Sequence, residues 1–132
     1  MKRRSFIALS ASIAVLPHAA FAEGFVDYRP GLIQSELAAG KTLLVDYSAT
    51  WCSTCARQER VIEALRGQNA AYDEALSFIK VDWDTYRSHA VTKSRGIPRR
   101  STLLILRGED ELGRIVAGTR ESDIQALMDL AL

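Results

Sequence analysis

Apolar residues form two kinds of pattern along this chain, and together they predict alternating strands and helices. Short, almost continuous apolar runs are typical of buried strands, and they occupy residues 42–47, 75–81 and 102–106. Apolar positions three and four residues apart predict helices over residues 31–40, 56–65, 85–94 and 121–130. Gly40, the last residue of the first stretch, and Gly67, just after the second, are stop signals. After a polar turn at residues 108–111, residues 112–117 return as a hairpin strand.

The order of these elements predicts an α/β fold. Strands that alternate with helices, followed by a hairpin and a last helix, are typical of a mixed sheet. We expect a central sheet of about four to five strands with helices on both faces. Apolar residues make up 48% of the chain, which is enough for one hydrophobic core.

The N-terminus has the pattern of an export signal. Residues 2–4 are basic, residues 6–16 form an apolar stretch, and Ala20-Phe21-Ala22 supplies the small residues of a cleavage site. This order predicts a secretory signal peptide over residues 1–22. The alternative is a permanent N-terminal anchor, but crossing a bilayer takes about 20 apolar residues and this stretch is shorter.

The expected signal peptide bears on compartment and charge. Arg3 and Arg4 before Phe6 also resemble a twin-arginine export signal, so the general secretory route and the twin-arginine route both stay open. Either route predicts a mature protein in a bacterial periplasm, with a single domain over residues 23–132. Removing the three basic residues of the leader changes the formal net charge from +1 to −2, which gives no reason to expect nucleic acid as a partner.

Cys52 and Cys55 are the only cysteines and stand two residues apart. A disulfide across so short a loop constrains the unfolded chain very little, so a purely structural role is disfavoured. C-x-x-C beside a βαβ pattern is instead a redox signature. If a helix begins at Cys52, both sulfurs share one helix face, and the helix N-terminus favours the Cys52 thiolate. Cys52 is then the nucleophile and Cys55 the resolving thiol of a thiol–disulfide exchange.

Metal binding is the alternative for the same pair. A structural zinc ion needs four ligands, whereas the mature chain offers two cysteines and one histidine, His89. We therefore expect no metal, and no cofactor other than a redox-active disulfide between Cys52 and Cys55.

Residues 44–55 (Leu-Val-Asp-Tyr-Ser-Ala-Thr-Trp-Cys-Ser-Thr-Cys) closely resemble the strand and active-site turn of thioredoxins. The resemblance extends over residues 40–131. In particular, this segment is similar to the C-terminal thioredoxin-like domain of the periplasmic electron transporter DsbD. It implies the thioredoxin fold and thiol–disulfide oxidoreductase activity. It also implies that Trp51 shields the site and packs against partners, the alternative being ordinary core packing.

Asp46 takes the place of the family's buried acid behind the cysteines. Desolvation should raise the pKa of a carboxyl on an inner strand, and this group could then accept the Cys55 proton through water. The alternative is a structural hydrogen bond at a frayed strand end. Many thioredoxins also carry a lysine near this acid, and the matching position here is Phe78.

The main departure from the family lies opposite the cysteines, where thioredoxins have a cis-proline before a buried strand. Either Pro98 fills that position and an insertion follows, or an ungapped match places Ser101 there. We prefer the ungapped match. A cis bond before serine costs ~3–4 kcal/mol, which favours a trans peptide at this position.

Substrate contacts are implied around the cysteines and around this position. The candidate substrate-binding residues are Ser53, Thr54, Arg100, Ser101 and Thr102. Arg99 and Arg100 would favour the Cys52 thiolate and acidic partner surfaces, or else they are solvated loop charges.

These features predict a periplasmic thiol–disulfide oxidoreductase that reduces protein disulfides through a mixed disulfide. Asp46 and the Trp51–Cys52 pair are thioredoxin-like, and no histidine stands between the cysteines as in strongly oxidising relatives. The resemblance implies a membrane electron transporter of the DsbD or CcdA type as reductant, and we expect a soluble monomer. The alternatives are a disulfide-forming oxidase and a non-catalytic metallochaperone or assembly factor that binds copper(I).

Overall fold

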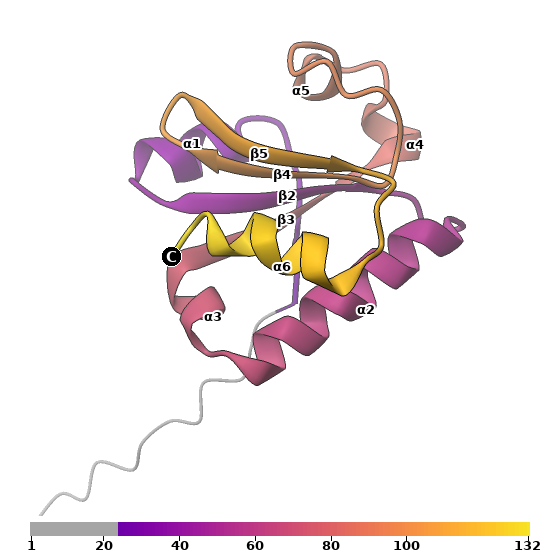
Figure 1. Ribbon diagram of the computed structural model, residues 1–132. Coiled ribbons are helices and arrows are strands. Elements are labelled where there is room, and N and C mark those ends of the chain that lie inside the picture. Colours follow the sequence, from indigo (N-terminus) through magenta and orange to yellow (C-terminus); the bar gives the residue numbers. More distant parts are fainter. Residues whose placement is uncertain (1–23) are drawn as a thin grey trace, which may run out of the picture.

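The computed structural model describes residues 24–132, which fold around a five-stranded sheet (Figure 1). The strands are β1 (Val26–Asp27), β2 (Thr42–Ser48), β3 (Leu76–Asp82), β4 (Thr102–Arg107) and β5 (Asp110–Val116). They lie in the order β1-β3-β2-β4-β5, so β2 is central. β2 is parallel to β3 and antiparallel to β4, which confirms the predicted mixed sheet. The predicted signal peptide lies outside the described residues.

Helices cover both faces of the sheet, as predicted (Figure 1). They are α1 (Leu32–Ala38), α2 (Ser53–Gln68), α3 (Ala71–Ala75), α4 (Trp83–Tyr86), α5 (Ala90–Lys93) and α6 (Glu121–Asp129). On one face, Leu43 and Val45 of β2 pack in a buried cluster with Ile33 of α1. On the other face, Leu44 packs in a second cluster with Ile62 of α2 and residues of α6. Within residues 24–132, no helix combines the length and the apolar character needed to cross a membrane.

The alternation of side chains along β2 positions the acid of the predicted site. Successive residues of a strand point to opposite faces, so Asp46 shares a face with Leu44. That face is the one covered by α2, whose first turn carries the cysteines. Asp46 is 0% exposed, lies within the strand, and has no hydrogen-bond partner among the described residues, so the alternative of a structural hydrogen bond at a frayed strand end is wrong.

The short apolar runs and the hairpin pattern predicted the sheet closely. Residues 42–47, 75–81, 102–106 and 112–117 correspond to β2, β3, β4 and β5, with small shifts at their ends. The predicted helices at both ends of the domain correspond to α1 and α6. Continuous apolar character is a strong signal for β2, β3 and β4 because most of their residues are buried, whereas the edge strand β5 has no buried residue.

The predicted helix over residues 85–94 is wrong as a single element, because the chain forms α4 and α5 instead. Asp82 Oδ2 accepts the Thr85 N–H at 3.0 Å and so caps the start of α4. His89 Nδ1 accepts the Val91 N–H at 3.1 Å and caps the start of α5. Each cap satisfies backbone donors at a separate helix start, so the chain turns between the two helices.

Two further differences concern helix ends and short elements. Gly67 does not end α2, which begins at Ser53 and runs to Gln68. β1 and α3 were not predicted, since elements of two and five residues are too short to show a period.

Candidate active site

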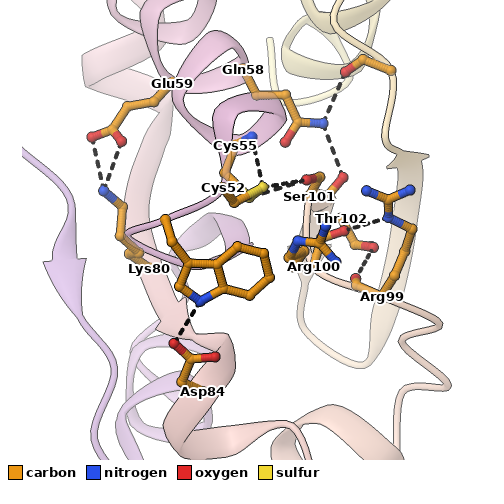
Figure 2. The surroundings of a disulfide bond; sticks show 12 residues. Cys52, Cys55, Gln58, Glu59, Lys80, Asp84, Arg99, Arg100, Ser101 and Thr102 are labelled. Carbon is orange, nitrogen blue, oxygen red and sulfur yellow. Dashed lines mark hydrogen bonds and ion pairs between the residues drawn. A yellow bond between two sulfur atoms is a disulfide. The ribbon is translucent and has the colours of Figure 1, made fainter.

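The two cysteines lie at the start of α2 and form a disulfide (Figure 2). Cys52 is the N-cap, with extended backbone, and its Sγ accepts the Cys55 N–H at 3.2 Å. The helix begins at Ser53, three residues before the predicted stretch 56–65, and the Cys52 sulfur satisfies a free backbone donor of its first turn. The consequence for the chemistry is unchanged, since the N–H groups of that turn still point at Cys52.

Both cysteines are buried, but Cys52 is the one with an approach from outside, as their predicted roles require. Cys55 is 1% exposed and lies one turn into the helix, whereas Cys52 is 5% exposed. Cys52 also lines a cavity of about 600 Å³ together with Ala49, Ala56 and Lys80. A substrate sulfur therefore has an approach to Cys52, while Cys55 is shielded behind it.

Ser101 lies directly opposite the cysteines, as the ungapped match predicted (Figure 2). Its Oγ is 3.2 Å from Cys52 Sγ and 3.1 Å from Cys55 Sγ, and the residue is 0% exposed. Pro98 is exposed, so the alternative that Pro98 faces the cysteines is wrong. The described residues contain no cis peptide bond, so the bond before Ser101 is trans. The backbone at Ser101 has φ +62°, a left-handed conformation that is uncommon for residues other than glycine.

Three hydrogen bonds hold the Ser101 backbone in that conformation. Its N–H donates to the Tyr47 carbonyl at 2.7 Å, and its carbonyl accepts the Ala117 N–H at 2.8 Å. Gln58 Nε2 donates to the same carbonyl at 3.0 Å and to the Gly118 carbonyl at 2.9 Å (Figure 2). β2, α2 and the segment after β5 therefore fix the position of the hydroxyl group together.

Gln58 was missed by the sequence reasoning, although a signal for it exists. Cys52, Cys55 and Gln58 are spaced three residues apart and so share one face of α2. Gln58 is 0% exposed, which is uncommon for a glutamine without bonding partners. A polar residue on the face that carries the cysteines is thus a candidate for holding the opposite loop.

Trp51 is a surface residue beside the disulfide. Its side chain is 58% exposed, so the alternative of ordinary core packing is wrong. The indole N–H donates to Asp84 Oδ2 at 2.8 Å, and the Arg100 guanidinium lies over the ring, 4.4 Å from its centroid. These contacts fix an exposed aromatic surface next to Cys52, which suits a partner-facing role.

The remaining predicted substrate-binding residues, Ser53, Thr54 and Thr102, differ in exposure. Ser53 is exposed, and Thr54 is half-buried in the first turn of α2. Both line a hollow of about 300 Å³ with the side chains of Arg57 and Arg60. Thr102 is buried, and its hydroxyl donates to the Arg99 carbonyl at 2.7 Å. This hydroxyl therefore holds the loop and does not face a substrate.

The loop arginines differ in their surroundings. Arg99 Nε donates to the Arg100 carbonyl at 3.1 Å, a contact within the loop itself. Arg100 stacks on Trp51, and its Nε is buried with no hydrogen-bond partner among the described residues. Arg100 is therefore a fixed part of the site rather than a freely solvated charge.

Asp46 is a buried carboxyl whose two oxygens have no hydrogen-bond partner among the described residues. Burial raises the pKa of Asp46 to about 7, because the charged form loses its hydration. The positive charge of Lys80 opposes this shift, and the negative charge of Glu59 adds to it. Near neutral pH the carboxyl can therefore both take up and release a proton.

The basic group near Asp46 comes from Lys80, not from the position matched by Phe78. Lys80 is the register partner of Asp46 on β3, and its Nζ lies 2.9 Å from both carboxylate oxygens of Glu59 (Figure 2). Phe78 is buried, with the Arg66 guanidinium 4.0 Å from its ring centroid. The lysine is thus supplied two positions along the same strand, where alternation gives it the same face.

Metal ligands are sparse around this site. Among residues 24–132, no group of three or more histidine, cysteine, aspartate or glutamate side chains is arranged to hold a metal ion. The chemistry that the arrangement supports is exchange at the Cys52–Cys55 disulfide.

The chain is similar to known thioredoxins in sequence and in structure. The thioredoxin family profile matches residues 31–130. Mitochondrial thioredoxin-2 of Schizosaccharomyces pombe is 30% identical over 128 residues, which cover 97% of this chain and 82% of that protein. The crystal structure of Trxlp from Edwardsiella tarda EIB202 matches with a TM-score of 0.65 and 33% identity, covering 80% of this chain and 95% of that one. Thioredoxin NaTrxh from Nicotiana alata matches with a TM-score of 0.63 over 81% of this chain and 91% of that one; at 24% identity it supports the fold alone.

Proposed function

We propose that this chain, which belongs to the thioredoxin family and is a thiol–disulfide oxidoreductase, works as a periplasmic reductase of protein disulfides. The observation that carries the reaction is the placing of Cys52 as N-cap of the 16-residue helix α2, with Cys55 shielded one turn further on. An N-cap sulfur faces unpaired N–H groups, which stabilise its thiolate.

The proposed reduction proceeds in two exchange steps. The Cys52 thiolate attacks one sulfur of a substrate disulfide; that disulfide breaks, and its electron pair leaves on the other substrate sulfur. Cys55 then gives its proton through water to Asp46, and its sulfur attacks Cys52 Sγ. The mixed disulfide breaks, the substrate leaves with its second thiolate, and the protein retains the Cys52–Cys55 disulfide. The substrate gains the two electrons that the protein loses.

Three features support the proposed reductase. A carboxyl with a pKa of about 7 can take the Cys55 proton at neutral pH, which speeds release of the reduced substrate. The residues between the cysteines are Ser53 and Thr54, and neither adds a positive charge that would stabilise the reduced form further. Trp51 offers a flat exposed ring on which a protein substrate can pack.

The proposed location rests on the basic and apolar pattern of residues 1–22. A reductase outside the cytoplasm has no soluble reductant at hand, so a membrane electron transporter of the DsbD or CcdA type would restore its dithiol. Its clients would be protein disulfides of exported proteins, including oxidised cysteines of periplasmic enzymes and of apocytochrome haem-attachment sites. We expect the mature protein to act as a soluble monomer.

Insulin reduction by the purified protein tests the activity. Wild-type protein is expected to reduce insulin, Cys52→Ser to be inactive, and Cys55→Ser to accumulate a mixed disulfide with the substrate. A reduction potential near −270 mV is expected for a reductant, and a value above about −170 mV would instead identify a disulfide-forming oxidase. Tight copper(I) binding combined with no reduction of any disulfide would identify the metallochaperone alternative.

A separate experiment tests the location. The full chain and a chain that begins at residue 23 are expressed with the same C-terminal tag, and both are followed by cell fractionation. We expect the full chain alone in the periplasmic fraction, shortened by its leader. Retention of the full chain in the cytoplasm would contradict the proposed location and leave the insulin result unaffected.

A further inference from the structure

We infer that Ser101 is a catalytic residue whose hydroxyl group donates a hydrogen bond to whichever of the two cysteine sulfurs carries negative charge. Its Oγ lies almost equally far from the two, at 3.2 Å from Cys52 Sγ and 3.1 Å from Cys55 Sγ (Figure 2). Cys52 reaches solvent only through the cavity on its other side, and Ser101 is 0% exposed, so this donor supplies a hydrogen bond on the side of the sulfurs that faces the protein interior. The inference uses the disulfide chemistry alone and does not depend on the location or direction proposed above.

The direction of the hydrogen bond follows from the protonation states. A thiolate has no proton, so in the reduced protein Ser101 O–H must be the donor to the Cys52 thiolate. The same oxygen can accept the S–H of Cys55, because a hydroxyl group donates once and accepts as well. Hydrogen bonds to an ionised partner are stronger than those between neutral groups. Proline, which the family resemblance leads one to expect here, has no side-chain donor.

The backbone around Ser101 is held in a conformation that favours this contact. Its φ of +62° is unfavourable for a residue with a Cβ. The hydrogen bonds that the Ser101 backbone makes with Tyr47, Gln58 and Ala117 keep the residue in this conformation. A strained residue that its surroundings hold firmly is a frequent feature of functional sites. Here the result of that strain is a hydroxyl group aimed between two reacting sulfurs.

Reduction of the disulfide would use this donor twice. A thiolate of the electron-donating dithiol attacks Cys52 Sγ, the Cys52–Cys55 bond breaks, and its electron pair goes to Cys55 Sγ, which accepts from Ser101 O–H. Cys55 then takes up a proton. The second donor thiolate attacks the first donor sulfur, the bond to Cys52 breaks, and the Cys52 thiolate accepts the hydrogen bond from Ser101 O–H. The donor is oxidised to a disulfide, and this protein gains both electrons.

Two variants distinguish the effect of the Ser101 hydroxyl group from the effect of the backbone conformation. Ser101→Ala removes the hydroxyl and keeps a Cβ at positive φ, whereas Ser101→Gly removes the hydroxyl and relieves the backbone. Ser35→Ala is the matched control, since Ser35 is an exposed serine of α1 on the face opposite to α2. All three are compared with wild type as reduced, folded proteins.

Alkylation of Cys52 by iodoacetamide across a range of pH is the first measurement. In both Ser101 variants we expect the alkylation rate at pH 6 to fall by about tenfold, the effect of losing one hydrogen bond to a charged group. Equilibration with glutathione is the second measurement. Destabilising the thiolate disfavours the reduced form, so the equilibrium should shift about tenfold toward the disulfide, or about 30 mV more negative.

The outcomes separate an effect of the hydroxyl group from an effect of the backbone. Equal shifts in the alanine and glycine variants, with none in Ser35→Ala, support the inference. Unchanged alkylation and potential in both Ser101 variants overturn it. A shift in Ser101→Ala that Ser101→Gly lacks also overturns it, because the backbone and not the hydroxyl would then be responsible. If Ser101→Ala fails to fold, the glycine variant alone decides. These outcomes do not depend on whether the wild-type protein reduces insulin, which tests the proposed function instead.

Discussion

The backbone conformation and hydrogen bonding of Ser101 are ones that a proline could not adopt. Its N–H donates to the Tyr47 carbonyl at 2.7 Å, and its φ is +62°. Proline has no N–H and holds φ near −65°, so it violates both requirements at this position. The serine and the trans peptide therefore belong together, and the family's proline cannot simply be restored.

We predict that Ser101→Pro lowers the free energy of unfolding by about 3 kcal/mol or more. The variant loses the hydrogen bond to Tyr47, and the loop between Arg99 and Thr102 must move to accommodate the ring. Urea denaturation measures the loss. Pro98→Ala, at the exposed proline of the same loop, is the control and should change stability little. A Ser101→Pro protein as stable as wild type would contradict the observed backbone geometry.

Among the helices and strands, the sequence predicted what depends on extended apolar patterns and missed what depends on single side-chain contacts. β2, β3 and β4 are long, apolar and buried, so their pattern is unambiguous. The division of residues 85–94 into α4 and α5 depends on side-chain caps at Asp82 and His89. A periodic pattern of apolar residues does not distinguish one helix from two capped turns.

The same distinction applies to the active site: residues with a local sequence signal were predicted, and residues that depend on tertiary contacts were not. Cys52 and Cys55 carry their chemistry in their own spacing, so the sequence identifies them directly. Lys80 acts on Asp46 through the pairing of β3 with β2, and this register is not visible in a local window. Gln58 likewise acts on a loop far away in the sequence. Residues whose role depends on tertiary pairing are the ones that sequence reasoning missed.

The pairing of β2, β3 and α2 leads to a prediction about proton transfer. Lys80 lowers the pKa of Asp46 and Glu59 raises it, although burial has the largest effect. Lys80→Met removes the favourable positive charge and leaves Glu59 without its partner, so the pKa of Asp46 should rise above about 7. Glu59→Gln should move it in the opposite direction. NMR titration of the Asp46 carboxyl carbon in the oxidised protein measures both shifts.

A surface lysine provides the control for this pair. Lys41 forms an exposed ion pair with Glu36 on α1, on the other side of the sheet from Asp46. Lys41→Met should leave the Asp46 titration unchanged, since solvent screens exposed charges strongly. Shifts in the same direction for Lys80→Met and Glu59→Gln would contradict the electrostatic account and point to a change in burial instead.

The buried carboxyl of Asp46 links the active site to the stability of the folded protein. Asp46 lies on the α2 side of the sheet, next to the cluster that contains Leu44 and Leu103. Ionising a carboxyl in this surrounding costs free energy, because none of the described residues donates a hydrogen bond to it. A protein that needs a proton acceptor here therefore folds less stably at the pH where that acceptor is ionised.

The pH dependence of unfolding follows from the direction of this shift. The pKa of Asp46 is about 7 in the folded protein and near 3.8 when the chain is unfolded. Between these values the folded state binds a proton that the unfolded state has released, so stability falls as pH rises from about 4 to about 7. Above that range the loss is complete and amounts to about 4 kcal/mol, from a shift of about three pKa units.

Asp46→Asn removes this titration and should reverse the loss. We predict that the variant is more stable than wild type by up to about 4 kcal/mol at pH 8 and nearly equal to it at pH 4. Urea denaturation of both oxidised proteins at each pH gives the difference directly, and subtraction cancels the groups that they share. The variant should also reduce insulin more slowly, because its amide cannot accept the Cys55 proton. A difference in stability that does not change with pH would show that Asp46 is ionised throughout, and its assignment as proton acceptor would then fail.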